Sequence, residues 1–296
     1  MKIAAAAYPL DWLESWSAYE DKISSWVKDA ADAGADLLVF PEYGAMELAT
    51  LAGANVAADL EQSLFAVSDR MDEATQLHRR LAIEHDVHIL AASGPVAVPD
   101  GRPVNRAHFL SSDGKVAHQD KQIMTKFERD PWDVAPGGPL TLFETDLGRI
   151  GVLICYDSEF PLLGRALKDV DFLLVPSCTE AASGYWRVRI GAMARALEAQ
   201  CVSVMSSLVG PADWSEAVDI STGTGGVFGP PDIGFPADGV LSLGQMDQPG
   251  WTYAEIDTQR IAEVRENGIV ANRAHWDEQI DRSSTVTISD MRRQNP

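Results

Sequence analysis

Short apolar runs alternate with longer amphipathic stretches, and this pattern constrains the chain more than any other feature. Residues 36–40 and 171–175 are both apolar after an initial aspartate, and a proline follows each of them. Strands that are apolar throughout are buried on both faces, as in parallel sheets whose crossover connections are helices. Residues 12–33 and 60–81 carry apolar side chains at spacings of three and four, which predicts helices. We therefore expect an α/β layered fold.

The second half of the chain resembles the first. Between them, residues 107–110 and 116–119 flank the tight-turn sequence Ser111-Ser-Asp-Gly114, which predicts a hairpin. The remaining predicted strands are 3–8, 87–92, 150–154, 201–206, 226–228, 240–243 and 252–256, and the remaining helices are 162–168 and 185–199. The similarity of the halves suggests two sheets packed face to face with helices outside. No Pro/Gly-rich linker separates them, so we expect one domain over 1–280 and a polar tail over 281–296 that extends along a partner subunit.

The charge balance argues against several kinds of partner. The 296 residues include 24 Lys and Arg and 44 Asp and Glu, a formal charge of −20. Nucleic acids are bound through an excess of basic residues, and anionic membrane surfaces repel acidic proteins, so neither partner is expected. No apolar run approaches the ~18 residues of a membrane span, and the N-terminal run stops at Pro9 and Asp11, too early for a signal peptide. Three cysteines are too few for a disulfide framework, which suggests a reducing compartment. We therefore expect a cytoplasmic protein.

One cysteine lies where chemistry is expected. In Leu153-Ile-Cys155-Tyr-Asp-Ser-Glu-Phe-Pro161 a buried strand gives way to a polar turn, and ligands of α/β sheets bind beyond the carboxyl ends of strands. Cys155 is a candidate nucleophile, with the N–H of Tyr156 as a candidate oxyanion donor. The alternative is a buried structural cysteine. No histidine has an obvious orienting partner, so none stands out as the base; the six are His78, His85, His88, His108, His118 and His275.

Two other loops offer better partners for a cysteine nucleophile. Glu42 follows the apolar run 36–40, and a carboxylate that is partly desolvated there exchanges protons near neutrality. Lys121 ends the second strand of the predicted hairpin, where its charge would stabilise a tetrahedral intermediate. Taken singly, each residue has an ordinary alternative, because most Glu and Lys side chains are solvated surface charges.

Together these motifs resemble the nitrilase superfamily, the carbon–nitrogen hydrolases, whose members carry a Glu-Lys-Cys triad in that chain order. The matching positions are Pro41-Glu42, Lys121 and the segment Cys155-Tyr-Asp-Ser-Glu-Phe-Pro161. A second family glutamate maps to Glu128. The resemblance implies a four-layer αββα sandwich and association into homodimers or larger homo-oligomers.

The resemblance runs from Lys2 to about Asn272, with one departure. The family lysine is often followed by His-Leu, whereas Gln-Ile-Met-Thr follows Lys121 here. Lys126 is therefore the alternative for the lysine role, but it lies in the loop beyond the hairpin strand. Glu128 has its own alternative, a solvated loop charge.

The reaction that the resemblance implies is amide hydrolysis through a thioester. Glu42 takes the proton of Cys155, while Lys121 and the Tyr156 N–H stabilise the oxyanion. Glu42 then protonates the departing amine and activates water, and Glu128 orients the lysine or the substrate. The reaction needs no metal or cofactor, and the chain has no CxxC or HExxH spacing.

The residues after the nucleophile bear on the substrate. Cys155-Tyr156-Asp157 looks more like the amidase branches than the Cys-Trp-Glu of nitrilases or the Cys-Asn-Asp of carbamoylases. Arg187 and Arg189 either bind a substrate carboxylate as forked donors or form salt bridges between subunits. Cys178 and Cys201 are interpreted as ordinary buried thiols.

A small-molecule amide is therefore the expected substrate. Within the superfamily, the alternatives are a nitrilase and an N-carbamoyl amino acid amidohydrolase. The alternative of another class is a non-catalytic binding protein that keeps the fold.

Overall fold

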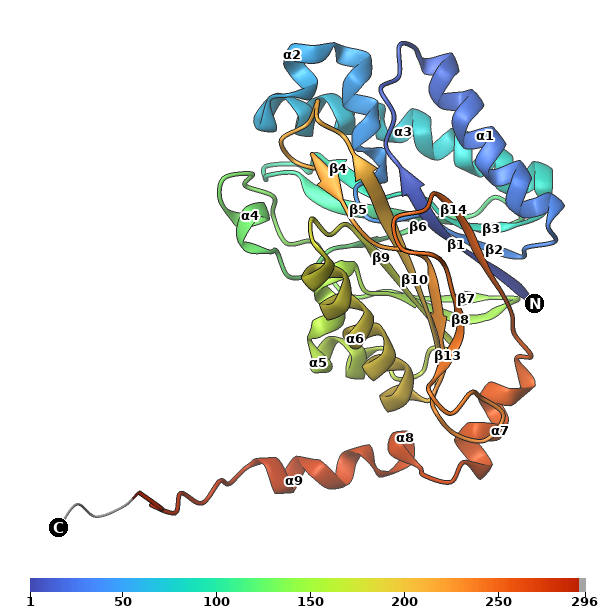
Figure 1. Ribbon diagram of the computed structural model, residues 1–296, viewed down its shortest axis with the longest axis vertical. Helices are drawn as coiled ribbons and strands as arrows, with labels where there is room; N and C mark the ends of the chain where they lie inside the picture. Colours follow the sequence, from blue (N-terminus) through green and yellow to red (C-terminus); the bar gives the residue numbers. More distant parts are fainter. Residues whose placement is uncertain (293–296) are drawn as a thin grey trace.

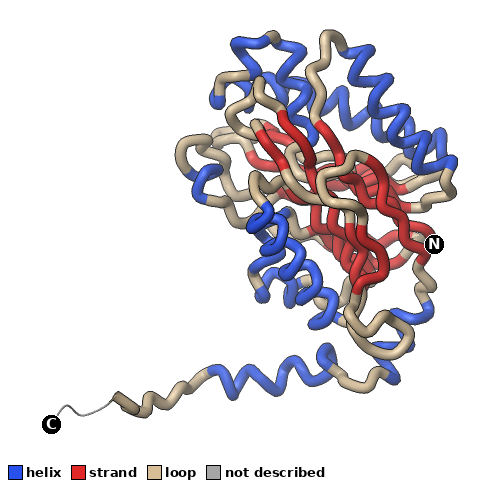
Figure 2. Tube along the Cα trace, in the orientation of Figure 1, coloured by secondary structure: helices blue, strands red, loops and turns tan. Residues whose placement is uncertain are grey.

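The computed structural model describes residues 1–292, in which strands fill the centre and helices cover the outside (Figures 1 and 2). The strands are β1 (Lys2–Pro9), β2 (Leu37–Val39), β3 (His88–Leu90), β4 (Gly94–Val96), β5 (Val104–Leu110), β6 (Val116–Asp120), β7 (Leu142–Thr145), β8 (Gly148–Val152), β9 (Phe172–Ser177), β10 (Val202–Pro211), β11 (Ile220–Ser221), β12 (Gly226–Phe228), β13 (Val240–Leu243) and β14 (Gly250–Glu255). The helices are α1 (Trp16–Asp32), α2 (Ala54–Ala57), α3 (Leu60–His85), α4 (Lys126–Arg129), α5 (Pro161–Ala166), α6 (Ala182–Ala199), α7 (Gln259–Asn267), α8 (Asn272–His275) and α9 (Ile280–Ser283), with 3₁₀ turns η1 (Gly44–Ala52), η2 (Cys155–Glu159) and η3 (Trp276–Gln279).

The long helices begin and end where local chemistry dictates. Ser15 caps α1 by accepting the N–H of Ala18, and Asp59 caps α3 by accepting the N–H of Gln62. Helix α3 ends at His85, and the next residue, Asp86, takes the left-handed conformation common after helix ends. The predicted apolar stripes of both helices are buried against the sheet, which confirms the helices expected from periodicity.

Nine strands form the main path of one curled sheet, in the order β4-β5-β3-β2-β1-β10-β9-β8-β7, and the other strands pair alongside it. We expected two separate sheets; instead, the parallel pairing of β1 with β10 joins them. That pairing covers only Ala7 to Pro9 against Ser207 to Val209, at one end of β1, so the two halves diverge from this seam. The predicted hairpin is present as β5 and β6, with Leu110 opposite Val116.

Alternation along the strands separates two apolar cores. In β1, Ala4 and Ala6 face the core under α1 and α3, whereas Ile3 and Ala5 belong to the core that the two sheet halves and α6 share. With α1 and α3 outside one half and α5 and α6 outside the other, the layers run α, β, β, α (Figure 1). This four-layer αββα arrangement is the predicted fold class.

Several short elements escaped prediction because their sequences carry no clear period. They include β4, β7, η1 and α4, none of which has more than nine residues. After α7, the chain runs through α8 and α9 away from the body of the molecule (Figure 1). Residues 281–292 of the predicted tail are exposed, and 293–296 lie outside the described residues. Within residues 1–292, no helix combines the length and the apolar character that crossing a membrane requires.

Candidate active site

Four segments that follow strands of the curled sheet meet in one place. Glu42 lies just beyond β2, Lys121 directly follows β6, Cys155 lies just beyond β8, and Cys178 directly follows β9. Glu42, Lys121 and Cys155 are almost completely buried, between 1% and 5% exposed. Charges are rarely buried unless they are paired, so this burial itself indicates a specific arrangement.

Lys121 joins the two glutamates. Its Nζ lies 2.7 Å from Oε1 of Glu42, and 2.8 Å and 2.7 Å from the two carboxylate oxygens of Glu128. A single buried ammonium thus donates to two buried carboxylates. The structure brings Lys121 to Glu42 and leaves Lys126 exposed on the rim of the cavity.

Glu128 is held by the start of α4. The Thr125 hydroxyl accepts the Glu128 N–H, and a Glu128 oxygen accepts the Thr125 N–H at 2.8 Å, a capping box that fixes the carboxylate. The Tyr43 hydroxyl donates to the same carboxylate at 2.7 Å. Glu128 is therefore a buried, fully engaged group rather than a solvated loop charge.

Cys155 sits on a sharp turn at the start of η2. Its φ is +49°, a left-handed conformation that costs a residue with a side chain of order 1–3 kcal/mol and often occurs at functional sites. Its thiol lies 3.7 Å from the carbonyl oxygen of Cys178. Tyr43, the residue after Glu42, is also left-handed, with φ of +56°, so both turns carry the same kind of strain.

Burial and charge set the protonation of the site. Burial raises the pKa of Glu42, although the charge of Lys121 opposes that rise. Burial and the nearby Glu42 charge raise the pKa of the Cys155 thiol well above its ordinary value. Burial alone would raise the pKa of Glu128 and lower that of Lys121, but their mutual attraction outweighs it, so the pKa of Glu128 is lowered and that of Lys121 is raised. Cys155 is thus a neutral thiol that needs a base.

Three participants were not predicted. The backbone N–H of Cys178 donates to Oε2 of Glu42 at 2.9 Å, and Cys178 is only partly buried in the cavity wall, which corrects its interpretation as an ordinary buried thiol. The amide of Asn105 donates to Oε1 of Glu42 at 3.0 Å. Tyr43 could have been suspected from its place beside Glu42, whereas Asn105 carries no signal in the sequence because only the fold brings it there.

These groups open onto a cavity of about 610 Å³. Its lining includes aromatic side chains, charged side chains and two thiols; they are Glu42, Tyr43, Lys121, Lys126, Phe127, Glu128, Trp132, Cys155, Tyr156, Glu159, Cys178, Glu180, Arg187, Glu216 and Asp219. The guanidinium of Arg187 pairs with Glu159 at 3.3 Å. Arg189 is not brought to the cavity: its guanidinium stacks over the rings of Trp186 and Phe228.

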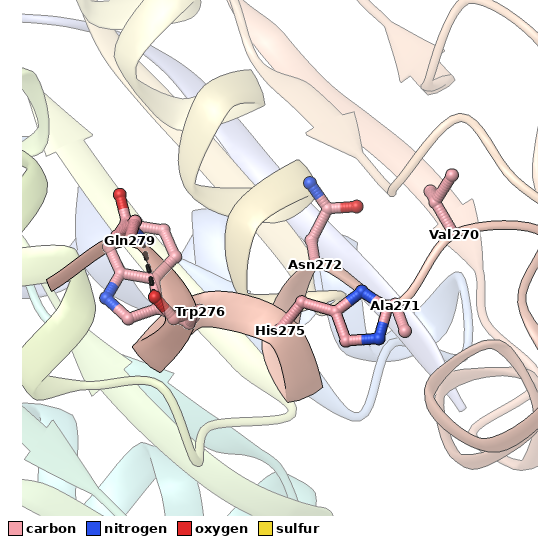
Figure 3. Close-up of a pocket in the computed structure, with 6 residues that line it drawn as sticks. All are labelled: Val270, Ala271, Asn272, His275, Trp276 and Gln279. Carbon is pink, nitrogen blue, oxygen red and sulfur yellow. Dashed lines mark hydrogen bonds between the residues drawn. The ribbon is translucent and has the colours of Figure 1, made fainter. Parts of the chain in front are cut away.

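Another hollow, of about 370 Å³, lies on the C-terminal segment (Figure 3). Its lining holds no member of the buried cluster and consists of Val270, Ala271, Asn272, His275, Trp276 and Gln279. Across residues 1–292, no group of three or more His, Cys, Asp or Glu side chains is arranged to hold a metal ion.

Comparison with known proteins decides the family. Residues 2–266 match the model of the carbon-nitrogen hydrolases. The chain belongs to this family. The resemblance read from the motifs is thereby confirmed.

Individual relatives agree with this membership. A probable hydrolase of Bacillus subtilis, YhcX, is 31% identical over 276 residues, which cover 91% of this chain; the chain spans about half (52%) of that relative. An (R)-stereoselective amidase of a Pseudomonas species is 31% identical over 185 residues, 60% of this chain and 61% of the relative. A solved structure of a mutant amidase from Nesterenkonia sp. AN1 superposes with a TM-score of 0.71 at 21% identity, covering 96% of this chain and 97% of that one. That structure supports the predicted fold, and it shows the acetamide moiety of fluoroacetamide attached covalently to the active-site cysteine of that amidase.

Proposed function

We propose that the protein hydrolyses the C–N bond of a small amide through a thioester on Cys155, releasing ammonia and a carboxylic acid. The observation that carries this proposal is the contact of one buried lysine with two buried carboxylates beside a buried thiol. A thiol whose pKa is raised is a poor nucleophile until a base takes its proton. Glu42, whose own pKa is raised, is suited to that exchange.

Acylation begins when Glu42 accepts the S–H proton of Cys155 and the sulfur attacks the carbonyl carbon. A C–S bond forms, and the carbonyl oxygen becomes an oxyanion. Lys121 and the N–H of Tyr156 stabilise this negative charge. The C–N bond then breaks, and Glu42 gives its proton to the leaving nitrogen, so ammonia departs and a thioester remains.

Deacylation uses the same groups with water as the nucleophile. Glu42 takes a proton from the water, whose oxygen attacks the thioester carbon. The C–S bond breaks, and the sulfur recovers its proton from Glu42. Glu128 does not exchange protons in this scheme: its lowered pKa keeps it ionised, and it holds Lys121 in place.

An amide is favoured over a nitrile or a carbamoyl compound. The support is the Cys155-Tyr156-Asp157 sequence together with the (R)-stereoselective amidase among the relatives. Glu159 already pairs with Arg187, and Arg189 lies away from the cavity. We therefore do not expect two free guanidinium groups that bind a substrate carboxylate.

An ammonia-release screen over small amides, ω-amides of dicarboxylates, nitriles and N-carbamoyl compounds tests the proposal. We expect ammonia from amides in wild type and none from Cys155→Ser. Carbon dioxide released together with ammonia would instead identify a carbamoyl substrate. Turnover by Cys155→Ser at the wild-type rate would refute the thioester mechanism. If a thiol-reactive amide formed no adduct at Cys155 in wild type, the non-catalytic binding protein would be the better description.

A further inference from the structure

Asn105 in β5 contacts the proposed base, Glu42, through its side chain. Its side chain is fully buried, and its Nδ2 donates to Oε1 of Glu42 at 3.0 Å. Its own carbonyl oxygen accepts the backbone N–H of Lys121 at 2.9 Å. One residue therefore holds both the carboxylate and the backbone of the lysine that pairs with it.

The two carboxylate oxygens of Glu42 accept different numbers of hydrogen bonds. Oε1 accepts two hydrogen bonds, from Lys121 at 2.7 Å and from Asn105 at 3.0 Å. Oε2 accepts one, from the N–H of Cys178, and the carbonyl oxygen of that same residue is the acceptor for the Cys155 thiol. Oε2 of Glu42 and the thiol of Cys155 therefore both lie against the backbone of Cys178.

The amide of Asn105 is oriented by Glu42 alone. Its Oδ1 is buried and has no hydrogen-bond partner within residues 1–292. An unpaired buried acceptor is unfavourable for folding, so stability does not explain an asparagine at this position. The opposite orientation would set Oδ1 against the carboxylate, acceptor against acceptor, which leaves the NH₂ group facing Glu42.

We propose that Asn105 is a positioning residue that directs the catalytic proton to Oε2 of Glu42. Two donors on Oε1 leave no room there for a proton, because both would have to turn away from it. The proton taken from Cys155 therefore stays on Oε2, the oxygen that contacts the same residue, Cys178, as the thiol does. Asn105 itself neither gives nor takes a proton. This role rests on the proposed function of Glu42 as the base.

The test uses the thiol instead of an unknown substrate. Iodoacetamide alkylation of Cys155 is followed by peptide mass spectrometry, which separates Cys155 from Cys178, and its rate is measured against pH in wild type and Asn105→Leu. Leucine has a similar shape but no donor. The charged or titratable groups that face Glu42 are the same in both proteins: Tyr43, Lys121, Glu128, Cys155, Asp157 and Cys178.

We expect the acid limb of the alkylation profile to move upward by roughly one pH unit in Asn105→Leu, because loss of a donor destabilises the ionised carboxylate. The plateau rate should fall about ten- to a hundredfold as the carboxylate loses its fixed orientation. Ser203→Ala is the matched control, since Ser203 is equally buried but its hydroxyl donates to Ala192 in α6. Its profile should equal that of wild type.

An unchanged acid limb in a folded Asn105→Leu protein, whatever its rate, would overturn the positioning role. If the leucine variant does not fold, Asn105→Ala replaces it, because alanine also lacks the donor and adds no titratable group beside Glu42. Absence of alkylation in wild type would contradict the proposed function itself, and so the two failures are distinguishable.

Discussion

Lys121 sets the charge balance of the buried cluster. Glu42 and Glu128 are both almost inaccessible to water, and Lys121 is the cation within hydrogen-bonding distance of them. Removing one partner of a buried ionic group leaves the other charges uncompensated, which costs more than the pair contributes. Compensation of both buried carboxylates therefore depends on the single positive charge of Lys121.

Lys121→Met should abolish turnover and lower the free energy of unfolding by about 3–5 kcal/mol at neutral pH. The pH dependence has a definite sign. Without the cation, the folded-state pKa of both carboxyls rises above the unfolded value. The loss of unfolding free energy relative to wild type is therefore fully present at a pH above those raised pKa values, and it shrinks as the pH falls through them. Urea unfolding at several pH values measures it.

Lys126→Met is the matched control for Lys121→Met. Lys126 is exposed at the rim of the same cavity, so its replacement should change the free energy of unfolding by less than about 0.5 kcal/mol. Turnover should remain. Equal losses in the two variants would contradict the assignment of the lysine role to Lys121.

At the scale of elements, Asp157 ties the cysteine turn to the lysine loop. Its carboxylate is buried in η2 and accepts the N–H of Ile123 at 2.8 Å and that of Gln122 at 3.1 Å, just after Lys121. It also accepts the N–H of Ile154, just before Cys155. Burial raises the pKa of Asp157 to about 7, although these donors and Lys121 oppose the rise.

Asp157→Asn should therefore loosen the link between two elements. Its NH₂ group would face backbone donors, so we expect a loss of about 1.5–3 kcal/mol in unfolding free energy, the range for hydrogen bonds to charged groups. We also expect kcat to fall more than tenfold while KM changes little, because the cavity walls persist.

Asp171→Asn controls for the general loss of an aspartate that accepts a backbone N–H, although Asp171 is only partly buried. Asp171 precedes β9, accepts the N–H of Arg149 at 2.9 Å and pairs with Arg265, far along the strand from the cavity. Its replacement should reduce stability but leave kcat unchanged. A proportionate loss of kcat in both variants would show that Asp157 acts only through stability.

At the scale of the whole molecule, the sequence predicted what depends on local pattern. The layers, the hairpin and the main helices follow from periodicity, and Glu42, Lys121 and Cys155 were candidates because each ends or follows a predicted strand. Asn105 and the backbone of Cys178 could not be predicted, because they are separated from Glu42 by 63 and 136 residues in the sequence. The seam between β1 and β10 escaped prediction for the same reason: it depends on strand pairing at long range.

The outer face of the second half carries apolar side chains that nothing covers within residues 1–292. On α6, Trp186 is 51% and Ile190 is 64% exposed, Leu197 continues the same face, and Leu162 of α5 lies exposed in the same helical layer. Large exposed apolar groups gathered on one face mark interaction sites. We propose that this face joins two copies of the chain, and that the exposed residues 281–292 pack on the partner.

Ile190→Glu should convert the proposed homodimer into a monomer, because it places a charge at the centre of an apolar contact. Light scattering coupled to size-exclusion chromatography measures the mass directly. Phe65→Glu is the matched control, since Phe65 is comparably exposed but lies on α3, on the opposite outer layer. We expect the control to stay dimeric. A monomeric wild type would refute the proposed dimer, and a dimer that Ile190→Glu leaves intact would show that α6 does not form the interface. Dissociation by Ile190→Glu alone would support the interface at α6.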